Sequence, residues 1–418
     1  MLENFIGRSP ARWVTSVFSR RKLEDVFTPE TPVADDKLFA GRERPRQLFE
    51  DAMRSKGAQV VIYGELGAGK TSLAESALSA MGWQYNRIQC EAISGEDELY
   101  RAILHRYGES RIVQETQSRE QTMQGGLSTV VTASGTATDR SGIIRGPYAS
   151  RPLTQDVVDV VGRSGIVCIL DDFEKSVGNR DEMSRAASFL GKVAADFGNQ
   201  YLRARFIVIG AADTALKLIP DPVSSRYREI HVPLMTREEL TQIIQIGERQ
   251  TGFRFQSDVV RRIVYISNGY PKFVHLLCLH AGRAAERRGR RQVVTDDLEE
   301  AIRDAVEVLR RQYEDAYHRA VRSNAGSRGF HRHVVHAMAG LEGERNTTEQ
   351  IVEAVRRLTD DPQIKVNQLR NALYQLQNVD RAAVLKRYED SVGVYGFRDL
   401  MFKAYVRLRC EQERGTVG

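Results

Sequence analysis

Cysteine is scarce in this sequence, and no two cysteines have the spacing of a metal or redox site. The chain has 418 residues and four cysteines, which are Cys90, Cys168, Cys278 and Cys410. The absence of a Cys-x-x-Cys pair excludes a zinc ribbon and a thioredoxin-like motif. Most of the four stand among apolar residues, as buried free thiols do in the reducing cytosol. We therefore predict a cytoplasmic protein.

Long apolar runs are also missing. No stretch reaches the roughly 18 consecutive apolar residues that a membrane-spanning helix needs. Residues 1–7 lack the basic-then-apolar order of a signal peptide. Residues 12–21 form a short basic amphipathic stretch, which can pack on its own domain, on a neighbouring subunit or on a membrane. We expect no membrane partner.

Neither sign of charge dominates the composition. The chain carries 61 Lys and Arg against 55 Asp and Glu, a net charge of +6. This balance permits nucleic-acid binding without requiring it. At about 100–200 residues per domain, the length predicts two or three domains.

Short apolar segments alternate with helical patterns between residues 37 and 235. The continuous apolar run at 166–170 is typical of a strand that is buried on both faces. Alternation of this kind predicts an α/β fold with a parallel sheet. The five predicted strands are 59–63, 85–90, 166–170, 206–209 and 230–232.

The rest of the chain divides around this predicted core. Residues 1–36 are expected to be a tail and linker, since Pro29 and Pro32 favour an extended path. An insertion at 114–150, rich in Ser, Thr, Gly and Val, can form a β-hairpin, a mobile loop or a contact with DNA or a partner. Residues 236–323 predict a helical lid. Residues 324–412 predict three helices followed by a β-hairpin, which describes a winged helix.

Residues 64–71 read G-E-L-G-A-G-K-T, which matches the P-loop motif G-x-x-x-x-G-K-[ST]. In this motif, glycines let backbone N–H groups cradle phosphate oxygens, and the following helix directs its positive end at the same anion. Lys70 is placed to meet the β- and γ-phosphates, and the Thr71 hydroxyl to meet magnesium. We therefore predict ATP and Mg²⁺ as ligands. The predicted nucleotide-binding residues here are Gly64, Glu65, Gly67, Ala68, Gly69, Lys70, Thr71 and Ser72.

A P-loop also needs carboxylates, and Asp171 and Asp172 follow the buried run at 166–170. Asp171 is predicted to hold magnesium together with Thr71. Asp172, with Glu174 behind it, is predicted to orient or deprotonate the attacking water, and the sequence leaves open which of them acts. A short Asp at position 172 suggests slow hydrolysis. Glu174 can alternatively pair with Lys175 or an arginine.

With its flanking motifs, the chain resembles AAA+ ATPases of the origin-recognition and STAND kind over residues 37–410. Residues 38–43, L-F-A-G-R-E, resemble the box that precedes the P-loop in that group, which implies that Arg42 lies near the adenine. Residues 267–272 resemble its sensor-2 region, with Pro271 against the adenine or Lys272 in place of the usual arginine. The resemblance implies an AAA+ type sheet, a lid and a winged helix.

Residues 224–234 resemble the arginine-finger box of the same group. A finger projects its fixed charge toward the γ-phosphate of a neighbouring subunit. Arg226 is the predicted finger and Arg228 the competitor, with a structural ion pair as the alternative. The polar sensor of the family falls at 210–214, G-A-A-D-T, where only Asp213 or Thr214 can serve.

The third helix of the predicted winged helix carries side chains that can contact base edges. Lys386 and Arg387 on the hairpin suit phosphates. A solvated helix face and a scaffolding winged helix are the alternatives, and the basic cluster at 283–291 is either a phosphate groove or a solvated helix end. The helix residues are Lys365, Asn367, Gln368, Arg370 and Asn371.

The sequence therefore predicts an ATPase that works as a nucleotide-controlled homo-oligomer on duplex DNA, like an initiator, a loader or a transposition regulator. It would bind ATP and ADP and hydrolyse ATP slowly. The alternative is a STAND-type signalling switch that recruits a protein effector, for example in prophage or antiphage defence.

Overall fold

The computed structural model describes residues 20–108, 112–115, 137–138, 143–145, 153–176, 179–196, 205–212, 215–219, 227–322, 330–389 and 391–415. Within these ranges, no helix has both the length and the apolar character that a membrane crossing requires. Most of the amphipathic stretch predicted at 12–21 lies outside them.

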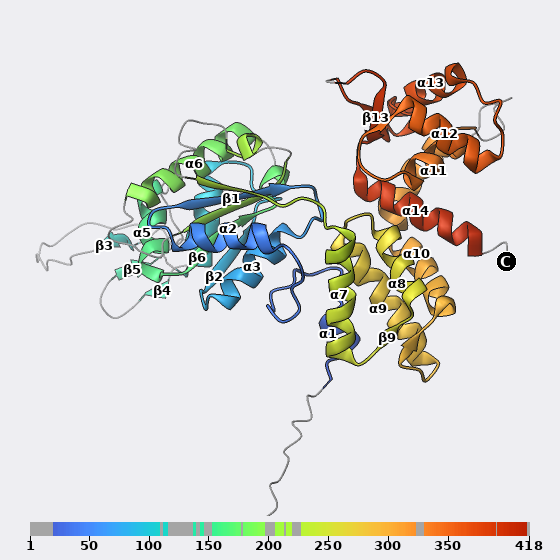
Figure 1. Cartoon of the computed structure of the whole chain (residues 1–418). Helices are drawn as coiled ribbons and strands as arrows, with labels where there is room; N and C mark the ends of the chain where they lie inside the picture. The colour runs from blue at the N-terminus through green and yellow to red at the C-terminus, as the bar shows by residue number, and fades with distance from the viewer. Residues whose placement is uncertain are drawn as a thin grey trace, which may run out of the picture.

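A five-stranded parallel sheet forms the core of the first domain (Figure 1), which confirms the predicted α/β fold. The strand order is β2-β6-β7-β1-β8, and each neighbouring pair is parallel. The central strands β6 and β7 are buried along nearly their whole length, as the apolar run at 166–170 predicted. The strands are β1 (Gln59–Gly64), β2 (Tyr85–Gln89), β6 (Val167–Asp171), β7 (Phe206–Ala211) and β8 (Tyr227–His231).

Helices cover both faces of this sheet. Alternate strand residues point to opposite sides, so Val167 and Ile169 pack with one helix layer and Cys168 and Leu170 with the other. The first layer consists of α2 (Glu43–Arg54) and α3 (Lys70–Ala80). The second consists of α4 (Glu96–Arg106), α5 (Thr154–Ser164) and α6 (Arg180–Asp196).

The insertion between β2 and β6 contains paired strands. β3 (Ile112–Glu115), β4 (Ala137–Thr138) and β5 (Ile143–Arg145) form a small antiparallel sheet in the order β3-β5-β4. The described part is thus larger than the hairpin that the sequence suggested.

Two helical units follow the sheet domain. The lid begins at a capping box, in which the Thr236 hydroxyl accepts from the Glu239 N–H. Its elements are α7 (Arg237–Thr251), β9 (Arg254–Phe255), α8 (Ser257–Ser267), α9 (Pro271–Arg287), β10 (Gln292–Val293) and α10 (Thr295–Val321). The C-terminal domain contains α11 (Phe330–Gly340), β11 (Asn346–Thr347), α12 (Thr348–Thr359), α13 (Val366–Gln375), β12 (Leu385–Arg387), β13 (Val394–Phe397) and α14 (Leu400–Gly415).

The lid and the C-terminal domain share one hydrophobic core. Helix α14 lies against α10 (Figure 1), where the Tyr313 and Tyr405 rings have centroids 5.4 Å apart. An ion pair of 2.9 Å between Arg262 Nη2 and Glu411 Oε2 joins α8 to α14. A shared apolar core resists separation, so these two units form a continuous body.

Residues 20–36, which we call the strap, differ from the extended linker that the prolines suggested. Helix α1 (Leu23–Val26) packs on α7 and α9 of the lid. The Phe27 side chain is 0% exposed, and its ring centroid lies 6.1 Å from that of Phe255. These apolar side chains bury themselves on the lid, which explains why the segment is ordered.

Candidate nucleotide-binding site

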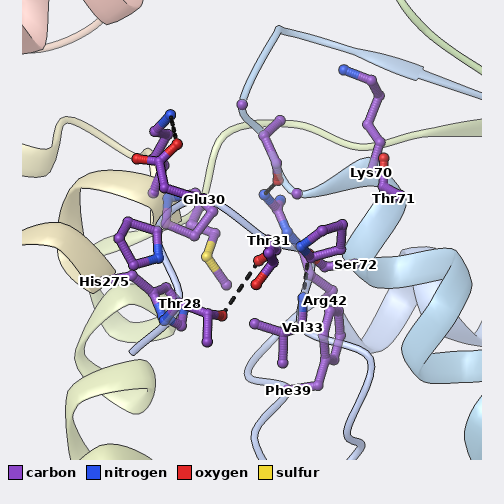
Figure 2. A pocket seen from close by; sticks show the side chains of 18 of the residues that line it. Thr28, Glu30, Thr31, Val33, Phe39, Arg42, Lys70, Thr71, Ser72 and His275 are labelled. Carbon is purple, nitrogen blue, oxygen red and sulfur yellow. Dashed lines mark hydrogen bonds and ion pairs between the residues drawn. The ribbon is translucent and has the colours of Figure 1, made fainter. Parts of the chain in front are cut away.

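A cavity of about 240 Å³ lies between the P-loop, the strap and the lid. Figure 2 shows Lys70 and Thr71 at one side of it and Thr28, Glu30 and His275 at the other. It lies at the carboxyl ends of the sheet strands, where α/β sheets usually bind ligands. Its lining includes strap residues 28–33, P-loop residues 66–71, Ser72, Phe39, Asp171, Asp172 and Pro271.

The P-loop glycines adopt backbone angles that favour glycine. Gly64, Gly67 and Gly69 have φ values of 145°, 78° and 89°. A Cβ on Gly64 would lie 2.2 Å from the Val232 carbonyl oxygen. The loop therefore needs these glycines to close around a phosphate.

Lys70 is 7% exposed, and its ammonium is hydrogen-bonded to the backbone of the loop. Nζ donates to the carbonyl oxygens of Gly64, at 3.1 Å, and Glu65, at 2.8 Å. Burial lowers the pKa of Lys70, while nearby carboxylates, Glu174 first among them, act in the opposite direction. A buried ammonium beside the phosphate cradle is suited to an anionic ligand.

Thr71 and Asp171 meet as the sequence predicted for a magnesium site. The Thr71 hydroxyl donates to Asp171 Oδ1 at 3.0 Å. Burial raises the pKa of Asp171, and the neighbouring Asp172 carboxylate raises it further. Two hard oxygen donors side by side fit Mg²⁺, which takes few protein ligands and completes its shell with phosphate and water. Among the described residues, no cluster of three or more His, Cys, Asp or Glu could hold a metal.

Arg42 lines the cavity, but its guanidinium holds the P-loop backbone. Nη2 donates to the Ala68 carbonyl oxygen at 2.7 Å, and the Arg42 N–H donates to Glu239 Oε1 at 2.7 Å. Burial lowers its pKa. The residue thus connects the P-loop to the first turn of the lid.

Two hydrogen bonds from backbone N–H groups to side chains hold the strap across the cavity (Figure 2). The Val33 N–H donates to the Ser72 hydroxyl at 3.1 Å on the core side, and the Thr28 N–H donates to His275 Nδ1 at 3.1 Å on the lid side. Burial lowers the pKa of His275 to about 4, so the ring is neutral and can accept this bond. Lys272 Nζ lies 3.4 Å from Glu30 Oε2, and Pro271 lines the cavity.

The family model of Novel STAND NTPase 1 matches residues 31–390. The chain belongs to this family. The match includes the P-loop, the strap from residue 31, the lid and most of the C-terminal domain. No protein with a curated description matches the sequence.

The solved structure of a Walker-type ATPase shares the fold of this STAND NTPase, and two further solved structures are similar to it at lower TM-scores. The Walker-type ATPase paby2304 of Pyrococcus abyssi is 15% identical with a TM-score of 0.52, over 92% of this chain and 99% of that one. Cdc6p from Pyrobaculum aerophilum is 14% identical, with a TM-score of 0.47 over 93% and 98%. The Aeropyrum pernix ORC1 protein, solved in complex with DNA, is 16% identical, with a TM-score of 0.46 over 95% and 98%.

Asp172 and Glu174 differ in their surroundings. Asp172 Oδ2 lies 3.3 Å from Lys175 Nζ. The alternative in which Glu174 pairs with Lys175 is therefore wrong, because this lysine pairs with the other acid. Arg180 donates to the backbone carbonyl oxygen of Glu174 and not to the Glu174 carboxylate.

The sequence did not reveal a partly buried ion pair beside Asp171. Arg87 Nη1 on β2 lies 3.0 Å from Glu75 Oε1 on α3 and 3.9 Å from Asp171 Oδ2. Burial raises the pKa of Glu75, and the arginine opposes that rise. The only sequence signal was a carboxylate within an otherwise small and apolar stretch of α3.

The structure describes Arg228 but not the other predicted finger and polar-sensor residues. Arg226, Asp213 and Thr214 lie outside the described residues. Arg228, the competing finger, lies on β8 and is exposed.

The basic cluster at 283–291 is largely neutralised within the lid. Arg288 Nη1 and Arg290 Nη2 each lie 2.9 Å from Asp297 Oδ1, and Arg287 pairs with Glu300. The Arg291 guanidinium carbon lies 4.6 Å from the Phe253 ring centroid. These contacts favour the solvated helix end over a phosphate groove.

The predicted DNA-contacting residues divide into two groups. Lys386 is half-buried, 5.2 Å from the Tyr388 ring centroid, and it counteracts the rise in the pKa of Glu65 that burial causes. Lys386 is therefore partly covered by its own domain, while Arg387 is exposed. The α13 group is exposed throughout: Lys365, Asn367, Gln368, Arg370 and Asn371.

The C-terminal domain also approaches the P-loop. A Cβ on Gly67 would lie 3.1 Å from Met401 Sδ on α14. Burial raises the pKa of Glu65, and Glu344 and Asp399 of the C-terminal domain raise it further. Residues far apart in the sequence therefore surround the phosphate loop, and no local motif could have indicated this.

Proposed function

We propose that this STAND NTPase binds ATP with Mg²⁺ and hydrolyses it slowly to ADP and phosphate. The observation that carries the proposal is the buried Lys70 ammonium at the P-loop, next to the paired oxygens of Thr71 and Asp171. A cation and a magnesium-ligand pair at a helix N-terminus suit a nucleoside triphosphate.

Each group has a separate role in this proposal. Lys70 counters the charge of the β- and γ-phosphates, and Thr71 and Asp171 would hold Mg²⁺. When bound, the ion neutralises the phosphate charge that grows during transfer. Asp172 and Glu174 are the acids available to orient water, and Arg226 of a second copy would complete the site in a homo-oligomer.

The nucleotide would join the core to the lid. The strap, Pro271 and His275 lie on the lid side of the cavity, and the P-loop lies on the core side. A ligand that contacts both sides stabilises the arrangement that brings them together. If ATP and ADP contact the lid differently, they would therefore favour different positions of the lid relative to the core.

We place duplex DNA on the C-terminal domain as the proposed partner, because the polar face of α13 is exposed. Asn, Gln and Arg side chains can contact base edges. Fluorescence anisotropy with labelled duplex DNA at several salt concentrations tests this. Salt-sensitive binding that requires ATP and is lost in Arg370→Ala supports DNA binding, and its absence at low salt refutes it.

A protein effector is the second candidate partner. Apolar side chains on the same domain are strongly exposed: Tyr374 is 65%, Val379 78% and Val392 94% exposed. Exposed aromatic and aliphatic groups favour protein contacts over phosphate contacts. This candidate predicts nucleotide that remains bound through purification, which chromatography of the denatured protein would detect.

Mass photometry separates the two candidates. The wild type and Lys70→Ala are measured with ATP, with ADP and with ATP plus duplex DNA. A larger wild-type assembly that needs both ATP and DNA supports the DNA-associated ATPase. Assembly that ignores DNA, or a monomer that retains nucleotide, supports the effector-recruiting switch.

A further inference from the structure

We infer that Glu174, and not Asp172, is the acid that orients and deprotonates the attacking water. The inference rests on the proposed ATPase function. It assigns the role to a residue two positions beyond the acid that directly follows Asp171.

Asp172 is engaged in holding the turn after β6. Its backbone has a φ of +53°, in the left-handed region, and its N–H donates to Asp171 Oδ1 at 3.0 Å. Its carboxylate lies 3.3 Å from Lys175 Nζ, one turn along the short helix η1 (Phe173–Lys175). The Lys175 ammonium therefore occupies a side of the Asp172 carboxylate that a water would otherwise contact.

Glu174 has a carboxylate oxygen that is buried and unengaged. Its Oε2 accepts no hydrogen bond from the part of the chain that the structure describes. A buried acceptor without a donor is costly, so the site favours a molecule that supplies one. The buried Phe173 side chain beside it anchors η1 on the second helix layer of the sheet domain.

The oxygen lies over Gly210, at the end of β7. A Cβ on Gly210 would lie 3.0 Å from Glu174 Oε2, and Gly210 itself lines the nucleotide cavity. A glycine at this position leaves space for the Leu218 side chain, whose Cδ2 would lie 2.5 Å from such a Cβ, and for the Glu174 carboxylate. Ala211 and Ala212 follow it and bring no polar side chain to this end of the strand.

The Glu174 carboxylate also acts on the pKa of the ammonium that would contact the γ-phosphate. Of the carboxylates that act on Lys70, Glu174 has the largest effect, ahead of Asp171 and Asp172. The carboxylate lies against Gly210, and Gly210 lines the cavity in which the γ-phosphate would be held. A water between this phosphate and Glu174 would donate to the unengaged oxygen.

The chemical step balances as follows. The water oxygen bonds to the γ-phosphorus, and the bond from this phosphorus to the β–γ bridging oxygen breaks. Its electron pair remains on ADP, and the Glu174 carboxylate accepts one proton of the water. The products are ADP and inorganic phosphate, and the proton passes from Glu174 to solvent.

Single-turnover hydrolysis of radiolabelled ATP tests the assignment in Glu174→Gln, Asp172→Asn and the control Glu229→Gln, whose parent side chain is exposed on β8. We expect Glu174→Gln to slow the chemical step about 100-fold or more, as removal of a general base does. Its affinity for ATP should stay within about threefold of wild type, because Lys70 still binds the phosphates. Asp172→Asn should lose less than about tenfold in rate.

Other results would overturn the assignment. One is an Asp172→Asn defect as large as that of Glu174→Gln; another is a Glu174→Gln variant that loses ATP binding or melts at a much lower temperature. A wild type that binds ATP but never hydrolyses it would refute the hydrolytic part of the proposed function together with this inference. A wild type that does not bind ATP would refute the proposed function itself.

Discussion

Single residues at the phosphate loop illustrate which contacts a sequence can indicate. Lys70 and Thr71 could be predicted because the P-loop motif has a fixed spacing. Asp171 could be predicted because it ends β6, which lies beside β7, and β7 in turn lies beside β1, the strand that leads into the P-loop. His275 and Glu75 could not, because each depends on a partner from a distant part of the chain. The role of a buried polar residue whose partner is distant in the sequence can be recognised only when the packing is known.

A substitution at Arg42 tests whether this side chain, which lies outside the P-loop, stabilises the conformation of the loop. Arg42→Met removes the bond to the Ala68 carbonyl, which is worth about 1.5–3 kcal/mol for a charged donor. We expect ATP and ADP to bind about tenfold more weakly, by equal factors, since the loop is loosened for both. Titration of a fluorescent nucleotide measures this, with the exposed neighbour Arg44→Met as the control. A loss confined to ATP would contradict this role.

His275 gives a pH-dependent contribution to stability. Its folded pKa of about 4 lies below the unfolded value of about 6.5, so the unfolded chain takes up the proton first. The stabilisation is complete above pH 6.5 and is lost as the pH falls toward 4. Between pH 7.5 and 5.0, the loss from this residue should be about 2 kcal/mol.

Urea unfolding of the wild type and His275→Asn at the two pH values checks this contribution. His336, whose pKa is also lowered to about 4 by burial, remains in both proteins and cancels in the comparison. The decrease in unfolding free energy should be smaller in His275→Asn by about the same 2 kcal/mol. An identical decrease in both proteins would show that His275 does not titrate in this range.

Whole elements were predicted with unequal success. The strands of the main sheet carry continuous apolar runs, and they formed close to the predicted positions. The strap was expected to be a plain linker, because Pro29 and Pro32 suggested an extended path. Leu23, Val26 and Phe27 instead pack on the lid, and this depends on a surface that a short local pattern cannot reveal.

Phe27 tests whether the strap supports the nucleotide cavity. Phe27→Ala removes a fully buried ring and should cost about 3–5 kcal/mol of lid stability. The neighbouring residues 28–33 line the cavity, so nucleotide affinity should fall as well. Thermal melting with and without ATP measures both effects, and the exposed Lys37→Ala is the control. If Phe27→Ala is destabilised but binds ATP as tightly as the wild type, the strap does not contribute to nucleotide binding.

At the scale of the whole molecule, the lid and the C-terminal domain share one core, while the sheet domain has cores of its own. The order of these units could be predicted from motifs and helix patterns. Their packing could not, because the pairing of Arg262 with Glu411 joins positions 149 residues apart. Relative movement should therefore occur between the sheet domain and the lid.

Distances between spin labels test whether the lid and the C-terminal domain move as one rigid unit. A label at Lys56 on the sheet domain and one at Arg357 on α12 should change separation between ATP and ADP. A label pair at Glu286 and Arg357, within the shared unit, should keep its separation. All three side chains are exposed, so labelling should not disturb packing. A nucleotide-dependent change within the second pair would place the hinge inside the shared core instead.

The most direct test of the account is calorimetric titration of Mg·ATP into nucleotide-free protein, for the wild type and for Lys70→Ala. Lys70 is the buried cation of the phosphate loop, and its removal leaves the rest of the cavity in place. We predict one ATP per wild-type chain and binding at least about 100-fold weaker in Lys70→Ala, with an unchanged melting temperature. Equal affinity in the two proteins, or no binding to the wild type, would contradict the account.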